Sequence, residues 1–313
     1  MRKKGQTTAI KRSPPILQYL QRDWQLYLLL IPVMLYYIVY QYLPMGGLVM
    51  SFQNYIPALG FFDSQWVGFD NFIRFFESYS FWRVLINTIE VSVLQLIFGF
   101  PFPVILALLL NEVRNKYFKR TVQTITYAPH FISTVVLVGM MTLVLSPSTG
   151  IVNKLIESLG GESINFMTEP GWFKPLYVIS DIWQNAGWGA IIYVAALSSV
   201  DPQLHESAVI DGANRWQRIW HINLPGILPT IIIMLIMQTG RVMNIGFEKV
   251  FLMQTDPNLV ASDVISTFVY RNGLIQGQLS FAAAVGMFNS VINFILVFVV
   301  NKISSKLSDI SLW

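Results

Sequence analysis

The chain has 313 residues, of which 54% are hydrophobic and 12% are charged, and its mean hydropathy is +0.52. So few charged residues cannot cover a soluble globule of this size with a polar surface, so the composition indicates a membrane protein. The net charge of +4 comes from Lys and Arg that cluster beside apolar runs, which favours membrane topology over nucleic-acid binding. The chain has no cysteine and only three histidines, so the sequence predicts no metal site.

Six apolar runs are each long enough to cross the hydrocarbon core of a bilayer, which takes about 20 residues of helix. They cover residues 27–50, 84–110, 121–145, 173–197, 224–245 and 279–300. Their continuous apolar character excludes the alternating strands of a membrane barrel. We therefore predict an all-α membrane protein whose six transmembrane helices form one domain, residues 24–301, between a basic segment, 1–23, and a short tail, 302–313.

The flanks of these runs indicate how the spans are oriented. The first run is retained rather than cleaved as a signal, because no Asp, Glu, Lys or Arg occurs from Trp24 to Phe62 and no small-residue cleavage pattern closes it. With the N-terminus inside, fourteen of the 21 Lys and Arg residues fall on the cytoplasmic side. Both termini are then predicted to be cytoplasmic.

The segment between the fourth and fifth spans, residues 201–225, reads DPQLHESAVIDGANRWQRIWHINLP and is called the coupling loop below. Asp201-Pro202 is typical of a helix start, and Gly212 ends or bends that helix. A second short helix is predicted after it, with Trp216, Ile219 and Trp220 on one face. The next span is predicted to begin at Leu224-Pro225.

The coupling loop resembles the cytoplasmic loop of permeases of binding-protein-dependent ABC importers, whose pattern is Glu-Ala-Ala, two residues, Asp-Gly-Ala, eight residues and Ile-x-Leu-Pro. The matching positions are Glu206, Ala208, Asp211, Gly212, Ala213, Ile222, Leu224 and Pro225. Ser207 replaces the first alanine and Ile219 stands where phenylalanine is frequent, and these changes keep the small size and the apolar character.

This resemblance implies the type I ABC importer permease fold in the plasma (inner) membrane of a prokaryote, as a multi-pass protein. The loop would seat on a cytoplasmic ATPase, with Trp216 and Ile219 as an apolar plug. The implied partners are a second related permease, two ATPase subunits that bind ATP and Mg, and an extracellular binding protein. No cofactor binds to this chain itself, which lacks the Gly-x-x-x-x-Gly-Lys-Ser/Thr loop of ATP-binding proteins.

Further segments resemble the branch of these permeases that handles oligosaccharides or polysaccharide fragments. They are WVGFDNFIRFF from Trp66, Asn87-Thr88, NEVRN from Asn111, YAPHFIS from Tyr127 and SLW from Ser311. Two long outer segments, residues 53–83 and 246–278, are predicted to be the docking surface for the binding protein. Their aromatic residues also fit simple seating at the membrane interface.

Three ionisable residues fall inside predicted spans, where a charge needs a partner or a water-filled path. Glu90, Asp181 and Arg241 all lie in the outer half of their spans. We predict that Arg241 pairs with Asp181 or Glu90 near the outer mouth of a pathway. The alternative is a purely structural ion pair.

Sugar binding combines aromatic faces with amide and carboxylate groups, and two predicted spans carry both kinds of side chain. The candidates are Trp183, Gln184, Asn185 and Trp188 in the fourth span and Asn289 and Asn293 in the sixth. The alternative is that the amides bond a neighbouring helix, since Ala282, Gly286 and Ser290 form a small-residue stripe typical of close packing.

Two other functions compete with the importer hypothesis. An intramembrane enzyme is disfavoured because no His-Glu-x-x-His or Gly-x-Ser-x-Gly motif occurs, and the sequence predicts no catalytic residue. A channel or ion-coupled carrier would not need the coupling loop. Uptake that requires ATP and a separate ATPase distinguishes the importer from both.

Overall fold

The computed structural model describes residues 23–308, and nearly all of its regular structure is helical. The basic segment before Asp23 and the terminal Ser311 to Trp313 lie outside the described residues. One two-stranded antiparallel ribbon is present, in which β1 (Gln53–Asn54) pairs with β2 (Gln65–Trp66). The predicted helical class is confirmed.

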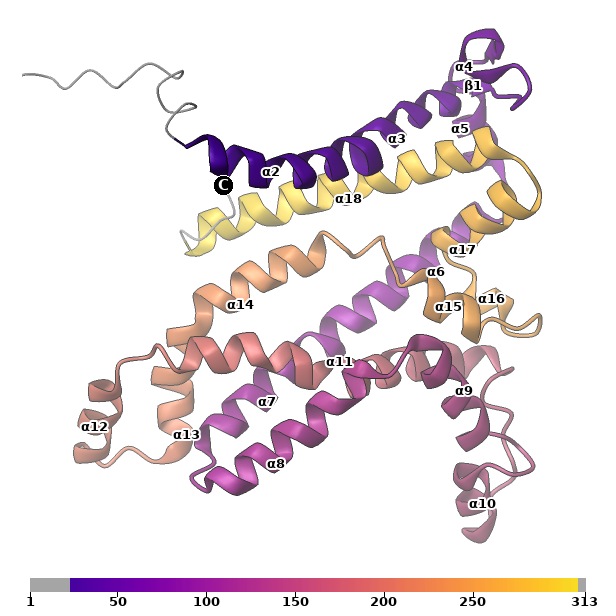
Figure 1. The fold of residues 1–313 in the computed structure, drawn as a ribbon. Coiled ribbons are helices and arrows are strands. Elements are labelled where there is room, and N and C mark those ends of the chain that lie inside the picture. The colour runs from indigo at the N-terminus through magenta and orange to yellow at the C-terminus, as the bar shows by residue number, and fades with distance from the viewer. Residues whose placement is uncertain (1–22, 309–313) are drawn as a thin grey trace, which may run out of the picture.

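The first apolar run forms a helical stretch of 29 residues. Its parts are α2 (Trp24–Tyr37), the π-helical turn η1 (Ile38–Tyr42), α3 (Leu43–Met45) and the 3-10 segment η2 (Gly46–Phe52), and α4 (Gly60–Asp63) and α5 (Asp70–Glu77) follow. Figure 1 shows α2 and α3 running alongside α18 (Leu279–Ser308). Every side chain of α2 is exposed, so this apolar helix offers its whole surface to lipid or to another chain.

The second run is one helix and the third is not. The second comprises α6 (Phe81–Leu94), η3 (Gln95–Gly99) and α7 (Pro101–Glu112). In the third, α8 (Lys116–Tyr127) and η4 (Ala128–Phe131) meet α9 (Thr134–Val144) at 101°, and α10 (Ile151–Ser158) follows. Pro129 lacks an amide donor, and the Ser133 hydroxyl accepts a hydrogen bond from the amide of Val136 to start a new helix. The span predicted for residues 121–145 is therefore a bent pair of helices.

The coupling loop runs into the following span without a break. After α11 (Pro170–Leu197) come α12 (Pro202–Ile210), α13 (Arg215–Arg218), η5 (Ile219–Asn223) and α14 (Leu224–Thr239). The fifth span was predicted to begin at Leu224-Pro225, whereas a continuous helix extends from Arg215 to Thr239. The π-helical turn η5 shifts the hydrogen bonding just before Pro225, which has no amide donor, so the helix continues through the proline.

Five further helical elements follow α14 in the described part of the chain. They are α15 (Phe247–Met253), α16 (Leu259–Ser262), α17 (Ile265–Tyr270), η6 (Arg271–Ile275) and α18. In Figure 1, α12 and α13 lie at one end together with the start of α2, the end of α18 and the α7–α8 junction. The α4, α5, α10 and α15–α17 helices lie at the opposite end.

Within residues 23–308, four helices are long and apolar enough to cross a membrane, or five if the bent pair counts as one span. They cover Trp24–Phe52, Phe81–Glu112, Arg215–Thr239 and Leu279–Lys306. The predicted fourth span corresponds to α11, which is 28 residues long but is not among them. Asp181, Gln184 and Asn185 lower its hydropathy, so six spans are not established by length and composition.

The buried apolar residues of the described chain form three clusters, and two of them contain residues of α11. One joins α11 to α6, α9 and α15, a second joins α5 and α6 to α17 and α18, and a third joins α11 to α7 and α14. The backbones of α11 and α8 approach each other closely at Gly187. A Cβ placed on this residue would lie 2.0 Å from the carbonyl oxygen of Thr126. Only glycine fits at this crossing.

Candidate functional site

The coupling loop is built as the sequence predicts, by local hydrogen bonds. The Asp201 carboxylate accepts a hydrogen bond from the amide of Gln203 at 2.9 Å and caps α12. Gly212 ends α12 with φ at +79°, a conformation that favours glycine. Asn214 and Gln217 then form a reciprocal capping box that starts α13.

The residues matched in the coupling loop divide among three environments. Glu206, Ser207 and Pro225 are exposed, while Ala208, Asp211, Gly212, Ala213 and Ile222 line a hollow of about 310 Å³ between α12 and α13. Trp216, Ile219 and Leu224 line an apolar groove of about 420 Å³ against α7. Of the two residues predicted as an apolar plug, Ile219 is only 8% exposed, whereas Trp216 is 67% exposed. Further exposed apolar surface comes from Trp220, which is 62% exposed, and from Ile210 on α12, which is 86% exposed.

An ion pair joins the coupling loop to the end of α7. The Arg218 guanidinium lies 3.7 Å from the Glu112 carboxylate, and the Asn223 amide nitrogen lies 3.4 Å from the other Glu112 oxygen. Asn223 is fully buried. No role was predicted for Glu112 beyond its place in the NEVRN segment, although an acid at the end of an apolar run indicates a residue that needs a partner.

A polar cavity of about 400 Å³ opens between α6, α11 and the end of α14. Its polar lining side chains include Gln95, Asp181, Asn185, Gln238, Arg241 and Asn244. The α11 wall is ordered by a chain of hydrogen bonds, in which His130 contacts the Asn185 oxygen at 3.0 Å and the Asn185 amide donates to Asp181 at 3.0 Å. The Gln95 amide donates to the second Asp181 oxygen at 2.5 Å. A volume of this size lies in the ~300–1,000 Å³ range of small-molecule sites.

The two intramembrane acids are paired with lysines rather than with Arg241. Lys174 contacts Glu90, and Lys249 lies 3.7 Å from Asp181. Within residues 23–308, Arg241 makes no ion pair and lies on the wall of the polar cavity. The prediction that Arg241 pairs with either acid is therefore wrong, because α11 and α15 bring Lys174 and Lys249 to the two acids.

The predicted sugar-binding residues differ in what they contact. Asn185 lines the polar cavity, and Asn289 donates to the Asn244 oxygen at 2.9 Å and so holds another lining residue. Gln184 and Asn293 bond backbone groups of Ile132 and Met243 and therefore serve helix packing. Trp188 stacks on His130, and Trp183 is 48% exposed and does not line the cavity. Two further amides that line the cavity, Gln95 and Gln238, were not predicted, although each is a polar residue within an apolar run.

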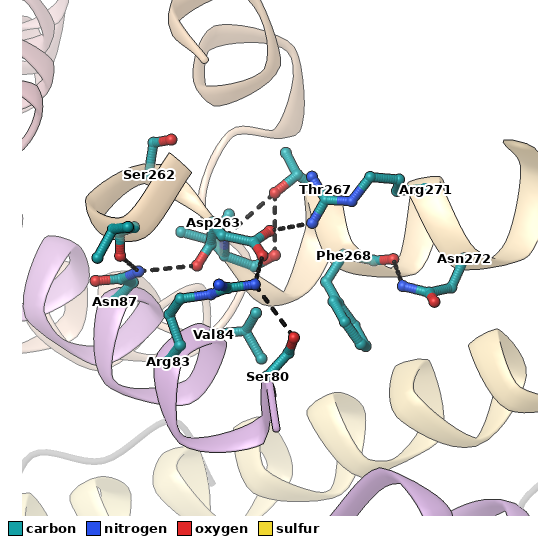
Figure 2. A network of polar contacts seen from close by, with 12 residues as sticks. Ser80, Arg83, Val84, Asn87, Ser262, Asp263, Thr267, Phe268, Arg271 and Asn272 are labelled. Carbon is teal, nitrogen blue, oxygen red and sulfur yellow. Dashed lines mark hydrogen bonds and ion pairs between the residues drawn. The ribbon is translucent and has the colours of Figure 1, made fainter. Parts of the chain in front are cut away.

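At the end opposite α12, Asp263 is fully buried between two arginines, as Figure 2 shows. Its oxygens lie 3.0 Å from the Arg83 guanidinium and 2.6 Å from that of Arg271. The Asn87 amide donates to the carbonyls of Val260 and Asp263, at 2.8 and 3.1 Å. This Asp263 cluster fixes the α16–α17 segment to the start of α6, so the two predicted docking segments are joined to each other.

Most of the helical bundle matches a known protein family. A family model described as "Binding-protein-dependent transport system inner membrane component" matches residues 99–309. The match spans the coupling loop, the Asp263 cluster except Arg83 and Asn87, and the polar cavity except its wall of Ser92, Gln95 and Leu96.

Individual relatives match over nearly the full chain. Protein LplB of Bacillus subtilis is 46% identical over 96% of this chain and 98% of its own length. The polygalacturonan/rhamnogalacturonan transport system permease protein YteP of the same organism is 43% identical over 96% of this chain and 93% of its own length.

A solved structure agrees with the fold. It is a bacterial alginate ABC transporter in complex with an alginate pentasaccharide-bound periplasmic protein. One of its chains has a TM-score of 0.88 and 41% identity, covering 96% of this chain and 100% of that one.

Proposed function

Since the chain belongs to the family of binding-protein-dependent transport system inner membrane components, we propose that it is a permease subunit of an ATP-driven importer for an oligosaccharide or polysaccharide fragment. The observation that carries this proposal is the coupling loop, whose exposed α12 projects at one end of a helical bundle that also contains a polar cavity (Figure 1). The names of YteP and of the alginate transporter support a saccharide as the transported molecule.

We propose six spans, with α11 as the one that length and composition alone do not select. Its polar residues Asp181 and Asn185 line the cavity. They therefore contact water and protein groups rather than lipid, which removes most of the free-energy penalty of placing them in a membrane span. The α12 end is assigned to the cytoplasm, since the clusters of Lys and Arg flank it. Both termini are then cytoplasmic, in the plasma membrane of a prokaryote.

The proposed assembly contains a second related permease, two ATPase subunits and an extracellular binding protein. The helix α2, which has no buried residue, and the open cavity favour a second permease that completes the pathway. ATP and Mg²⁺ bind to the ATPase subunits, which dock on α12. The binding protein docks at the opposite end, where the Asp263 cluster holds the segments of residues 53–83 and 246–278 together.

Ile210→Glu tests the docking of the ATPases. Ile210 is 86% exposed, so a charge there disturbs no buried contact but opposes an apolar interface. We expect at least a tenfold loss of ATPase subunits recovered with the tagged permease. The matched control is Leu159→Glu, which changes an 80% exposed residue after α10, at the opposite end, and should leave recovery unchanged.

Reconstitution into proteoliposomes tests transport itself. Uptake of a labelled oligosaccharide should require ATP, the ATPase subunits and the binding protein together. Uptake that continued without the ATPases would overturn the proposal. Uptake abolished by collapse of the ion gradient alone would support the ion-coupled carrier instead.

A further inference from the structure

The charges around the polar cavity do not cancel. Asp181 is the acid on its wall, and protein groups already engage both of its oxygens. Lys249, with a side chain only 6% exposed, lies 3.7 Å from one oxygen, and Gln95 donates to the other. The negative charge of Asp181 is therefore compensated within the protein.

Arg241 supplies a positive charge that nothing in the described part of the chain compensates. It is exposed to the cavity and makes no ion pair within residues 23–308. Glu90 contacts Lys174, and Glu248 on the neighbouring α15 is exposed and makes no ion pair with Arg241. The cavity thus carries one net positive charge at its α14 end.

Neutral hydrogen-bonding groups surround this charge. The Asn244 oxygen accepts a hydrogen bond from Asn289, so the Asn244 amide nitrogen remains as a donor. Gln238 stands one helical turn before this part of the wall and also lines the cavity. An arginine beside amides offers paired donors for a carboxylate and further donors and acceptors for hydroxyl groups.

We propose that the transported saccharide is acidic and that Arg241 binds a carboxylate on its sugar ring. This inference rests on the proposed import function and names the substrate class of the same cavity. A neutral sugar would leave the guanidinium without an anionic partner. The carboxylate of a uronate unit instead accepts two parallel hydrogen bonds from the planar guanidinium. Arg241 is then a specificity-determining residue of the pathway.

The test compares uronate trisaccharides with the same trisaccharides after their carboxyl groups are reduced to neutral alcohols. Uptake is measured in proteoliposomes that contain the complete complex and its binding protein. The wild-type complex should import an acidic trisaccharide and not its neutral counterpart. Import of a neutral trisaccharide at an equal rate overturns the inference but leaves the importer function intact, whereas no ATP-dependent uptake of any oligosaccharide overturns the importer function itself.

Variants then place the selectivity at Arg241. Arg241→Gln should lower uptake of the acidic trisaccharide at limiting concentration by about 10- to 100-fold, mainly through a higher KM. Arg241→Lys keeps the charge without the fork and should recover part of the loss. Lys154→Gln removes an exposed cation on α10, which does not line the cavity, and should have no effect. Uptake unchanged in Arg241→Gln would overturn the inference, and recovery of intact complex on size exclusion shows that the variant is folded.

Discussion

Replacing Asp263 by asparagine removes one negative charge from a position that is fully buried between two arginines. The amide has nearly the same shape as the carboxylate, so the change tests charge rather than packing. Breaking a buried ion pair costs about 3–5 kcal/mol when it leaves a charge without a partner. Arg83 and Arg271 are 28% and 30% exposed, so water replaces part of the lost interaction. We therefore expect a loss of about 2–4 kcal/mol.

The assay is the midpoint of thermal unfolding of the purified complex. A loss of this size should lower that midpoint by roughly 3–6 °C. Hydrogen exchange should also rise first in α16 and α17, which the Asp263 cluster fixes to α6 (Figure 2). Asp256→Asn is the matched control, because Asp256 is exposed in the same segment. If both variants melted at the same temperature, the reasoning about the buried charge would be refuted.

Two further predictions concern the helix crossing and the coupling loop. Gly187→Ala places a methyl group 2.0 Å from the Thr126 oxygen and should cost about 1–3 kcal/mol in stability, whereas Gly286→Ala, where no atom of another segment lies within 4 Å, should not destabilise the protein. A normal melting temperature for Gly187→Ala would contradict the close contact. Glu112→Gln weakens the pair with Arg218 and should lower sugar uptake per ATP hydrolysed several-fold while ATPase subunits remain bound. An unchanged uptake-to-hydrolysis ratio would show that this pair does not transmit movement.

The features that the sequence predicted best are those that depend on neighbouring residues. Asp201 caps α12, and Gly212 adopts positive φ after it, because a side-chain acceptor and a missing Cβ act locally. Four of the six apolar runs coincide with helices of sufficient length and hydropathy, since continuous apolar character is a direct requirement of the bilayer.

The features that it missed depend on contacts between distant residues. Lys249 and Asp181 are far apart in sequence, and no periodicity indicates that α15 folds back against α11. A hydropathy scale also underestimates the tendency of α11 to span the membrane. The scale assigns Asp181 the free energy of transfer into lipid, although in the structure Asp181 has protein partners. The partner of Arg241 was predicted wrongly for the same reason, since both acids had unseen lysines beside them.

The continuity of α13, η5 and α14 has a mechanical consequence for the proposed importer. This helix begins inside the coupling loop at Arg215, ends at Thr239, and spans about 37 Å at 1.5 Å per residue. Gln238 lies in the last turn of this helix, Arg241 lies two residues beyond its end, and both line the polar cavity. A tilt imposed on α12 and α13 therefore moves the α14 wall of the cavity against the α11 wall.

The position of Glu112 determines where such a tilt would pivot. Its contacts with Arg218 and Asn223 hold the helix against α7 near the coupling loop, at the π-helical turn η5. A pivot close to one end of a rigid helix converts a small displacement at the loop into a larger one at the far end. The amides and the arginine at that far end would then separate from Asp181 and Asn185, which changes the width of the cavity without unfolding either wall.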